Sequence, residues 1–368
     1  MTASSLPFLD LRPGEDAADL RLAIDRVLAR GWLVLGPEVQ AFEAEFAAAS
    51  GTRYAVGVAS GTDAIALLLR AIDIGPGDEV IVPALTAAFT ALAVTSIGAR
   101  PVFVDVEADR LTMDPDACAA AVTSRTRAIV PVHLYGQAAD NEALHAVAAS
   151  NSLAIVEDCC QAHLGTCSGV PVGTTGTGGA FSFYPTKNLG ALGDGGAIIT
   201  NDAGIAERVR RLRNGGQRDR YDHVEVGINS RLDEIQAAIL RTRLKRLQQW
   251  TARRRELAAA YRRHLPSDIR TVPERDAGHV YHLFPVRSSQ RASLQAHLRS
   301  AGIETLIHYP AALPQQQAFA AFAPAECPEA SRAASEVLSL PLYPSLADST
   351  VVRIADAVAA FQKGHMLA

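Results

Sequence analysis

The sequence predicts an α/β protein with a large, mainly parallel sheet and a smaller α+β region towards its C-terminal end. Between about residues 54 and 206, short apolar runs alternate with helix-like segments, which is the rhythm of βαβ units. Several of these runs are continuously apolar, as in strands buried on both faces of a sheet. Beyond residue 233 the pattern changes, which indicates a second structural region.

The elements of the first region can be assigned in order along the chain. The first thirty residues predict an extended arm and a first helix, and residues 31–36 predict a loop. Strands are expected at residues 54–59, 79–83, 101–106, 128–133, 153–158, 179–184 and 197–200. Helices are expected between most of them, at residues 64–72, 86–97, 116–122 and 141–149.

The second region begins with residues 233–264, which predict one long helix or two in tandem. We interpret its arginines as a solvated helix face rather than an anion-binding one. Pro266 and Pro273 end this pattern. Short strands are expected at 280–286 and 305–308, and helices at 293–300, 332–338 and 349–361. We therefore expect a large domain at residues 1–245 and a small one at 246–368.

Composition narrows the class of protein. The 368 residues are 48% hydrophobic and 20% charged, as in ordinary globular proteins, and the net charge of −4 argues against nucleic-acid binding. The five cysteines form no C-x-x-C pair, so neither a metal site nor a disulfide framework is expected. The sequence shows no signal-peptide pattern and no apolar run of membrane-spanning length. These features predict a cytoplasmic enzyme with no membrane partner.

Lys187 is the strongest candidate for chemistry. It follows an apolar strand-like run in Phe181-Ser182-Phe183-Tyr184-Pro185-Thr186-Lys187, and glycines follow it. A lysine held on such a loop is partly desolvated, so that its ammonium loses a proton easily and becomes a nucleophile.

Asp158 supplies a carboxylate at the end of another predicted strand. Both residues fall at carboxyl ends of strands, where sites in parallel sheets are expected. A lysine for a Schiff base and an aspartate for a pyridinium nitrogen form the pattern of a pyridoxal-phosphate site. Taken alone, Asp158 could equally be a buried hydrogen-bonding residue or a helix cap. Gln161 could donate to the phenolic oxygen of such a cofactor or simply be a polar surface residue.

Ser60-Gly61-Thr62-Asp63 joins a predicted strand to a predicted helix. Gly61 allows close backbone approach, free N–H groups at a helix start attract an anion, and Thr62 adds a hydroxyl donor. A phosphate fits there, although Ser60 and Asp63 also have the spacing of a capping box. Ser182 could be a further phosphate donor or a small core residue.

Asn229 and the His308-Tyr309 pair are weaker candidates. Asn229 precedes the long helical segment, where it could be a plain helix cap or could reach another subunit's site. His308 and Tyr309 follow a short predicted strand, where they could contact substrate or be structural. Tyr184 is a third candidate for substrate contact.

Taken together, these motifs resemble the DegT/DnrJ/EryC1/StrS family of pyridoxal-phosphate-dependent sugar aminotransferases. The resemblance covers almost the full length, and is carried by GPEVQAFEAEFA, ASGTDAI, GPGDEVIVP, VHLYGQ, VEDCCQAH, FSFYPTKNLGALGDGGA, NSRLDEIQAAIL, IHYP and EVLSLPLYP. It implies the fold-type-I architecture and a homodimer with active sites at the subunit interface.

The resemblance also implies residue roles. Lys187 would form the Schiff base with pyridoxal 5′-phosphate and shuttle protons, Asp158 would pair with the pyridine nitrogen, and Gln161 would lie near the phenolic oxygen. The phosphate would be held by Gly61, Thr62 and Ser182, and by Asn229 of the neighbouring subunit. Ala87 stands where many members carry an aromatic residue stacked on the cofactor ring.

The implied reaction moves an amino group from L-glutamate or glutamine to a nucleotide-linked keto sugar. By overall resemblance, a dTDP-3-keto-6-deoxyhexose aminated at C3 is favoured. Amination at C4, a cyclitol ketone substrate and a non-catalytic regulatory protein are the alternatives. Because some members are dehydratases with histidine at the lysine position, Lys187 favours transamination.

Overall fold

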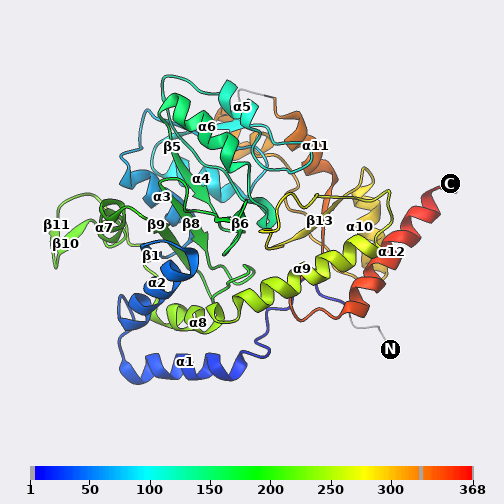
Figure 1. The fold of residues 1–368 in the computed structure, drawn as a ribbon, viewed down its shortest axis with the longest axis horizontal. Helices are drawn as coiled ribbons and strands as arrows, with labels where there is room; N and C mark the ends of the chain where they lie inside the picture. Colours follow the sequence, from blue (N-terminus) through cyan, green and yellow to red (C-terminus); the bar gives the residue numbers. More distant parts are fainter. Residues whose placement is uncertain (1–4, 323–325, 367–368) are drawn as a thin grey trace.

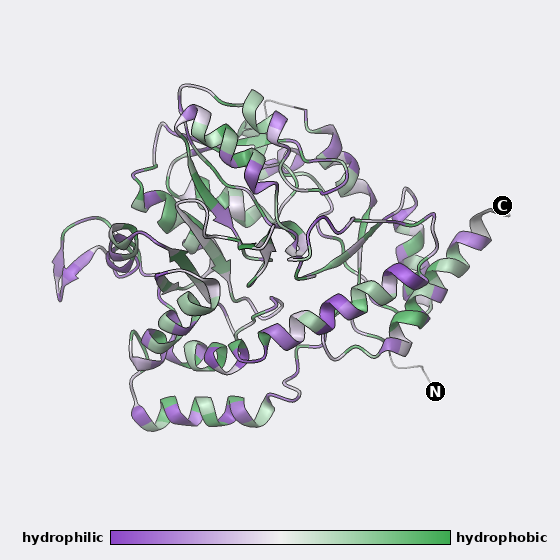
Figure 2. Ribbon diagram, in the orientation of Figure 1, coloured by the Kyte–Doolittle hydropathy of each residue, from purple (hydrophilic) through white to green (hydrophobic). Residues whose placement is uncertain are grey.

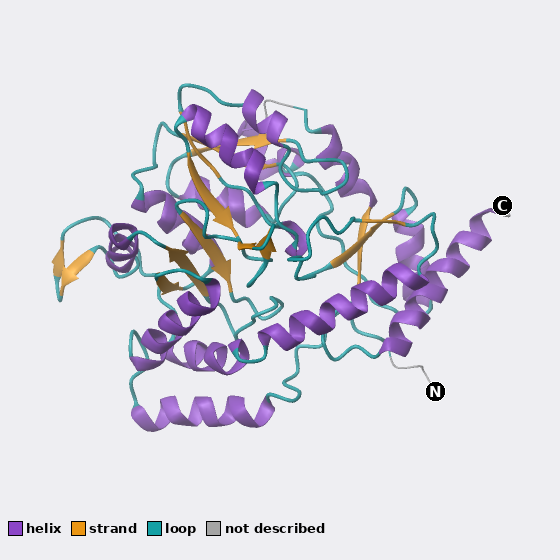
Figure 3. Cartoon of the chain, in the orientation of Figure 1, coloured by secondary structure: helices purple, strands orange, loops and turns teal. Residues whose placement is uncertain are grey.

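A computed structural model describes residues 5–322 and 326–366 and contains one large sheet (Figures 1 and 3). Its seven strands lie in the order β1-β9-β8-β5-β4-β2-β3. All neighbouring strands are parallel except at β9, which is antiparallel to both of its neighbours. The strands are β1 (Tyr54–Val58), β2 (Glu79–Pro83), β3 (Arg100–Val104), β4 (Thr126–Ile129), β5 (Ala154–Asp158), β8 (Gly178–Ser182) and β9 (Gly196–Thr200).

Helices connect most of the parallel strands and cover both faces of the sheet, as the continuous apolar runs predict. Along β2, Val80 and Val82 enter one hydrophobic cluster while Ile81 enters another, because successive side chains point to opposite faces. The apolar segments of Figure 2 gather around this sheet accordingly. The helices are α2 (Pro37–Ser50), α3 (Gly61–Ala71), α4 (Ala88–Ser96), α5 (Pro115–Ala120), α6 (Asn141–Asn151), α7 (Ala203–Leu212) and α8 (Glu234–Leu244).

The N-terminal helix α1 (Ala17–Arg30) packs against α8 and ends at Gly31, which has a positive φ of 71°. The loop that follows returns the chain to α2. Val34 forms a single bridge with Asp233, so this loop lies beside the start of α8.

The C-terminal region is built on the antiparallel sheet β12-β13-β14. A third hydrophobic cluster fills it, with Tyr261, Phe284 and Leu338 among its buried residues. Its strands are β12 (Arg270–Thr271), β13 (Phe284–Arg287) and β14 (Val337–Leu340), and its helices are α9 (Leu247–His264), α10 (Arg291–Ser300), α11 (Pro328–Glu336) and α12 (Asp348–Met366). The shorter elements of the chain are β6 (Thr166–Cys167), β7 (Val170–Pro171), β10 (Gln217–Asp219), β11 (Asp222–His223) and the 3₁₀ helices η1 (Leu134–Gly136), η2 (Leu313–Gln315) and η3 (Gln317–Phe322).

Most of the expected elements are confirmed. In the large sheet, the strand expected at 128–133 lies at Thr126–Ile129, and in the C-terminal region the strand expected at 280–286 begins only at Phe284. The other corrections also lie in the C-terminal region. The segment 233–264 forms two helices, α8 and α9. The expected strand at 305–308 is wrong, since Leu306 forms only a single bridge with Ser339. The expected helix at 332–338 ends at Glu336, because the β-branched Val337 has extended angles and begins β14. The division into domains at residues 245 and 246 stays a prediction; it falls in the turn between α8 and α9.

No described helix combines the length and the apolar character that a membrane span requires.

Candidate active site

The ends of β5 and β8 and the start of α3 meet at one point. In the parallel pair formed by β5 and β8, Asp158 lies opposite Ala180, two residues before Ser182. A Cβ atom added to Gly61 would lie 2.6 Å from Cys160 Sγ and 2.7 Å from Ser182 Cβ. Only glycine therefore lets the start of α3 approach these strand ends so closely.

The start of α3 keeps backbone N–H groups available for an anion. Ser60 caps the helix by accepting the Asp63 N–H at 3.1 Å. The Asp63 side chain does not complete a capping box, since it accepts a hydrogen bond from Ser230 Oγ at 2.6 Å. The first N–H groups of a helix have no intrahelical partner, so those of Gly61 and Thr62 are free to point out of it.

Ser230 connects the start of α3, which we call the anion cradle, to the segment before α8. Its hydroxyl also accepts the Ala59 N–H at 3.0 Å. Asn229 directly precedes this buried serine and is itself exposed. The structure thus places Asn229 near the start of α3 of its own chain, but among the described residues its side chain makes no hydrogen bond to Lys187 or Asp158.

Lys187 lies on a turn between β8 and β9, where its N–H donates to the Tyr184 carbonyl at 2.8 Å. Desolvation lowers the pKa of its ammonium, while Cys160 and Asp158 oppose that shift, so both lie close to it. The next residue, Asn188, is buried. Its amide nitrogen donates to the Val280 carbonyl at 2.9 Å and its amide oxygen faces His282 Nδ1 at 3.2 Å. The lysine loop is therefore anchored to the segment that leads into β13.

Asp158 is 5% exposed, and its carboxylate accepts two hydrogen bonds. Thr90 Oγ1 donates to its Oδ2 at 2.8 Å, and the Cys160 N–H donates to its Oδ1 at 3.1 Å. These bonds fix the carboxylate plane and leave acceptor capacity for a cationic partner. Thr90 is a site residue that the sequence analysis missed. It lies four residues after Thr86, and nothing in that spacing distinguishes it from an ordinary helix residue.

Gln161 is held at both ends of its amide. Its oxygen accepts the Tyr135 N–H at 2.7 Å, and its nitrogen donates to the Tyr309 hydroxyl at 3.1 Å. The Tyr135 hydroxyl in turn donates to the His308 carbonyl at 2.5 Å. The predicted pair His308-Tyr309 is thus brought to Gln161 from the C-terminal region, with one amide proton of Gln161 left free.

The side chains of His308 and Tyr184 have different surroundings. Burial and the nearby Lys187 lower the pKa of His308 to about 4, so this ring is neutral and close to the lysine. Tyr184 is 51% exposed, and its side chain forms no hydrogen bond or ring pair with any of the described residues. A substrate contact of Tyr184 stays a prediction.

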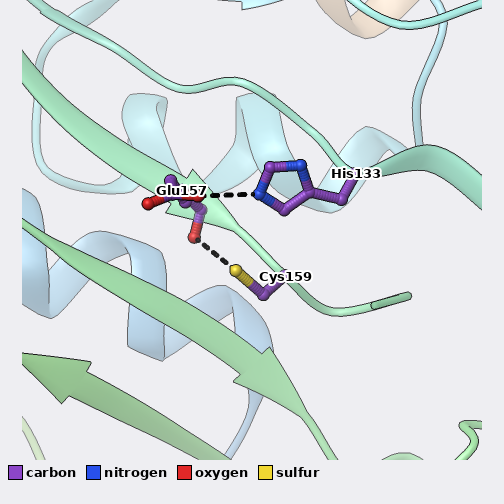
Figure 4. A group of neighbouring side chains, drawn as sticks. All are labelled: His133, Glu157 and Cys159. Atoms are coloured by element: carbon purple, nitrogen blue, oxygen red, sulfur yellow. Dashed lines mark hydrogen bonds and ion pairs between the residues drawn. The ribbon is translucent and has the colours of Figure 1, made fainter. Parts of the chain in front are cut away.

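His133, Glu157 and Cys159 form a buried cluster behind Asp158 (Figure 4). His133 Nδ1 accepts the Ala139 N–H at 3.1 Å, which leaves the proton on Nε2, 3.0 Å from Glu157 Oε2. Glu157 accepts four further hydrogen bonds, from Asn141 Nδ2, the Gly173 N–H, and the N–H and hydroxyl of Thr175. Since both ring nitrogens and the carboxylate already have partners, we interpret the cluster as a structural network rather than a metal site.

The comparisons with known proteins agree with this geometry. Residues 15–359 match the model of the DegT/DnrJ/EryC1/StrS aminotransferase family. The chain is 49% identical over 360 residues to the dTDP-3-amino-3,4,6-trideoxy-alpha-D-glucose transaminase of Streptomyces venezuelae, covering 96% of this chain and 95% of that protein. It is 48% identical to the erythromycin biosynthesis sensory transduction protein EryC1 of Saccharopolyspora erythraea over 349 residues, covering 93% of this chain and 95% of that protein.

The fold agrees with a solved structure as well. The crystal structure of S. venezuelae DesV in complex with a ketimine intermediate superimposes with a TM-score of 0.94 at 48% identity, covering 98% of this chain and 99% of that one. The family model matches nearly the whole length of this chain. The chain is therefore an aminotransferase and belongs to the DegT/DnrJ/EryC1/StrS family.

Proposed function

We propose that this protein transfers an amino group from L-glutamate or glutamine to a nucleotide-linked keto sugar with pyridoxal 5′-phosphate as cofactor. The observation that carries the proposal is the meeting of Lys187, with its lowered pKa, and the buried Asp158 beside the glycine-lined start of α3. A desolvated amine, a fixed carboxylate and an anion cradle are the three features that this cofactor needs.

The cofactor would be held by residues that already lie together. Asp158 would face the pyridine nitrogen, Gln161 would offer its free amide proton to the phenolic oxygen, and Lys187 would bind the aldehyde carbon. Gly61, Thr62 and Ser182 would receive the phosphate. Ala87 offers no aromatic ring to stack on the cofactor, and Phe89, two residues further on, has a side chain that is 62% exposed.

When bound, pyridoxal phosphate supplies a carbonyl that captures amines and a ring that withdraws electrons from the substrate carbon. The protein's own residues then control charge and protons. Asp158 keeps a positive charge on the ring nitrogen, and Thr90 keeps that carboxylate oriented. Lys187 Nζ takes and returns the proton at the reacting carbon, for which a lowered pKa is suited.

The proposed acceptor is a dTDP-3-keto-6-deoxyhexose, aminated at C3. It is supported by the name of the S. venezuelae relative, a dTDP-3-amino sugar transaminase. Amination at C4 and a cyclitol ketone remain the alternatives within catalysis. The name of the EryC1 relative keeps a regulatory role as the candidate from another class, against which the intact Lys187 and Asp158 pair argues.

We also propose a homodimer in which Asn229 reaches the partner's phosphate site. The exposed apolar residues Trp32 and Leu33, at 55% and 51%, precede Val34, which bridges to Asp233. An exposed apolar patch beside the Asn229 segment is what a subunit contact at the site requires.

The test is a two-stage reaction with purified protein. L-glutamate alone should convert the loaded enzyme to its aminated form and release 2-oxoglutarate. A dTDP-3-keto-6-deoxyhexose should then yield the 3-amino sugar, identified by mass and NMR. Release of 2-oxoglutarate with amination of another ketone would correct the acceptor only, whereas no 2-oxoglutarate from loaded enzyme would refute the proposed reaction.

A further inference from the structure

Arg254, on α9, is a buried cation with no counter-charge among the described residues. It is 4% exposed, which corrects the expectation that this helix presents its arginines to solvent. Its Nη1 donates to the carbonyls of Tyr281, His282 and Leu342, at 3.2, 3.4 and 2.8 Å. No carboxylate of the described residues forms an ion pair with it. Burying a positive charge whose only partners are carbonyl groups costs desolvation free energy. An anion that binds beside it therefore gains a strong electrostatic attraction.

Two cavities meet at this arginine. Arg254 and Thr186 line both a cavity of about 400 Å³ and a neighbouring one of about 570 Å³. The first is also lined by His282 and His308, and the second by Lys187. Burial, Lys187 and Arg254 together hold the pKa of His282 well below its usual range, so both cations lie near the same ring.

The other charges around the larger cavity already have partners. Arg12 pairs with Asp10, Arg243 with Asp16, and Arg253 with Glu256 and Asp348. Of the cations that line the larger cavity, Lys187 and Arg254 form no ion pair with any of the described residues. The space between them therefore favours a negatively charged ligand group.

The geometry of the guanidinium narrows the kind of anion. With Nη1 occupied by carbonyls, the edge formed by Nε and Nη2 is left. In two other arginines of this molecule, Nε and Nη2 together bind one carboxylate. Arg12 donates to Asp10 at 3.0 and 2.7 Å, and Arg26 donates to Glu38 at 2.7 and 3.1 Å. Two parallel donors match the two oxygens of one carboxylate.

We propose that the Nε/Nη2 edge of Arg254 binds a carboxylate of the amino-acid donor, beside Lys187. This deepens the proposed function and rests on it, since the amine-bearing carbon that reacts at Lys187 also carries a carboxylate. Burial lowers the pKa of Arg254 to about 10, and the guanidinium therefore keeps its charge at neutral pH.

The test compares Arg254→Gln with Arg255→Gln. Arg255 is the next residue on α9, is exposed, donates to one main-chain carbonyl at 2.9 Å and lines neither cavity. Calorimetry with glutarate, a dicarboxylate that cannot be transaminated, measures binding to the cofactor-loaded proteins without any turnover. We expect Arg254→Gln to weaken glutarate binding about 10- to 100-fold, and Arg255→Gln to leave it within about threefold.

Kinetics then separate the possible ligands. The KM for L-glutamate should rise in Arg254→Gln by the same factor, while the KM for the nucleotide sugar stays within about threefold. A rise confined to the nucleotide-sugar KM would overturn the proposal and assign Arg254 to the diphosphate. Unchanged glutarate binding would overturn it as well. Because glutarate binding is measured without catalysis, a failure of the proposed reaction does not hide this result.

Arg254→Gln also removes bonds to carbonyls and could fail to fold. Arg254→Lys keeps the charge and can keep one carbonyl contact, and it should show a smaller loss of glutarate affinity with normal thermal stability. A crystal structure of the wild type with glutarate gives a test that needs no variant. A carboxylate on the Nε/Nη2 edge supports the proposal, and one bound elsewhere overturns it.

Discussion

Asn188, the residue after Lys187, is bonded at both ends of its amide to the segment before β13, with its oxygen 3.2 Å from His282 Nδ1. The lysine loop of the large sheet is thereby held by the C-terminal region. Because Asn188 Nδ2 donates to a carbonyl, its oxygen must accept, and the neutral His282 ring must carry its proton on Nδ1.

Asn188→Ala should therefore misplace Lys187 without unfolding the protein. Loss of two buried hydrogen bonds corresponds to about 1–3 kcal/mol, and we expect kcat to fall about tenfold with a small change in Tm. Stopped-flow rates with L-glutamate and a thermal melt measure the two effects. Asn151→Ala, at the exposed end of α6, is the matched control. An unchanged rate would show that the anchor has no part in placing the lysine.

Lys187→Ala should abolish turnover, since it removes both the nucleophile and the proton carrier. The wild type should show a visible absorbance band that borohydride bleaches, with the cofactor attached to Lys187 in peptide mapping. Lys245→Ala, which alters an exposed lysine, should retain both properties. Normal amination by Lys187→Ala would rule out its assigned role.

Asp158→Asn should retain the fold and lose most of the activity, by about 100-fold or more in kcat. An amide is nearly isosteric but cannot hold a proton on the ring nitrogen electrostatically. Cofactor affinity, measured by fluorescence titration, should weaken much less than turnover. If this variant keeps wild-type rates, the ring nitrogen is paired with another residue.

Mixed dimers test the partner role of Asn229. Lys187→Ala and Asn229→Ala chains carrying different tags should each be inactive as homodimers. When exchanged, each hybrid has one site with both lesions and one with neither, so that activity should partly return. Confirmed hybrids without activity, alongside inactive Asn229→Ala homodimers, would assign Asn229 to the site of its own chain or to a helix cap.

Stability should fall as pH drops below about 6.5, the usual pKa of histidine. Burial lowers the pKa of His163 and His279 to about 3 and that of His308 to about 4. Between these values and 6.5 the unfolded chain binds protons that the folded chain does not, so acid favours unfolding. Each histidine contributes at most about 1.4 kcal/mol per pH unit. Urea unfolding at pH 7, 6 and 5 measures the slope, and equal stability at all three would contradict these directions.

The main residues of the site could be predicted from the sequence because they follow recognisable strands, and the geometry of a parallel sheet then places them together. Lys187 and Asp158 both follow apolar strand-like runs, and parallel strands bring their carboxyl ends to one edge. The pairing of β5 with β8 confirms that expectation. In the same way, Ser60-Gly61-Thr62 marks a strand-to-helix junction by its residue types alone.

The remaining site residues depend on packing that no local pattern records. Thr90 lies in a helix whose spacing is ordinary, and Asn188 and Arg254 have partners about ninety residues away or on separate segments. The prediction that Arg254 faces solvent is wrong, because it rests on the rule that charged residues on helices are usually solvated. The prediction that Val337 is helical is wrong as well. The alanine-rich residues before it favour a helix, whereas pairing with β13 makes Val337-Leu338-Ser339-Leu340 a strand.

The bond from Ser230 to Asp63 ties the segment that carries Asn229 to the phosphate cradle of its own chain. Under the proposed role of Asn229 in the neighbouring phosphate site, each subunit would support one site and complete the other. Separation of the subunits would then loosen the cofactor, and loss of the cofactor would weaken subunit association by the same free energy. Specific activity would accordingly fall on dilution and recover with added pyridoxal phosphate.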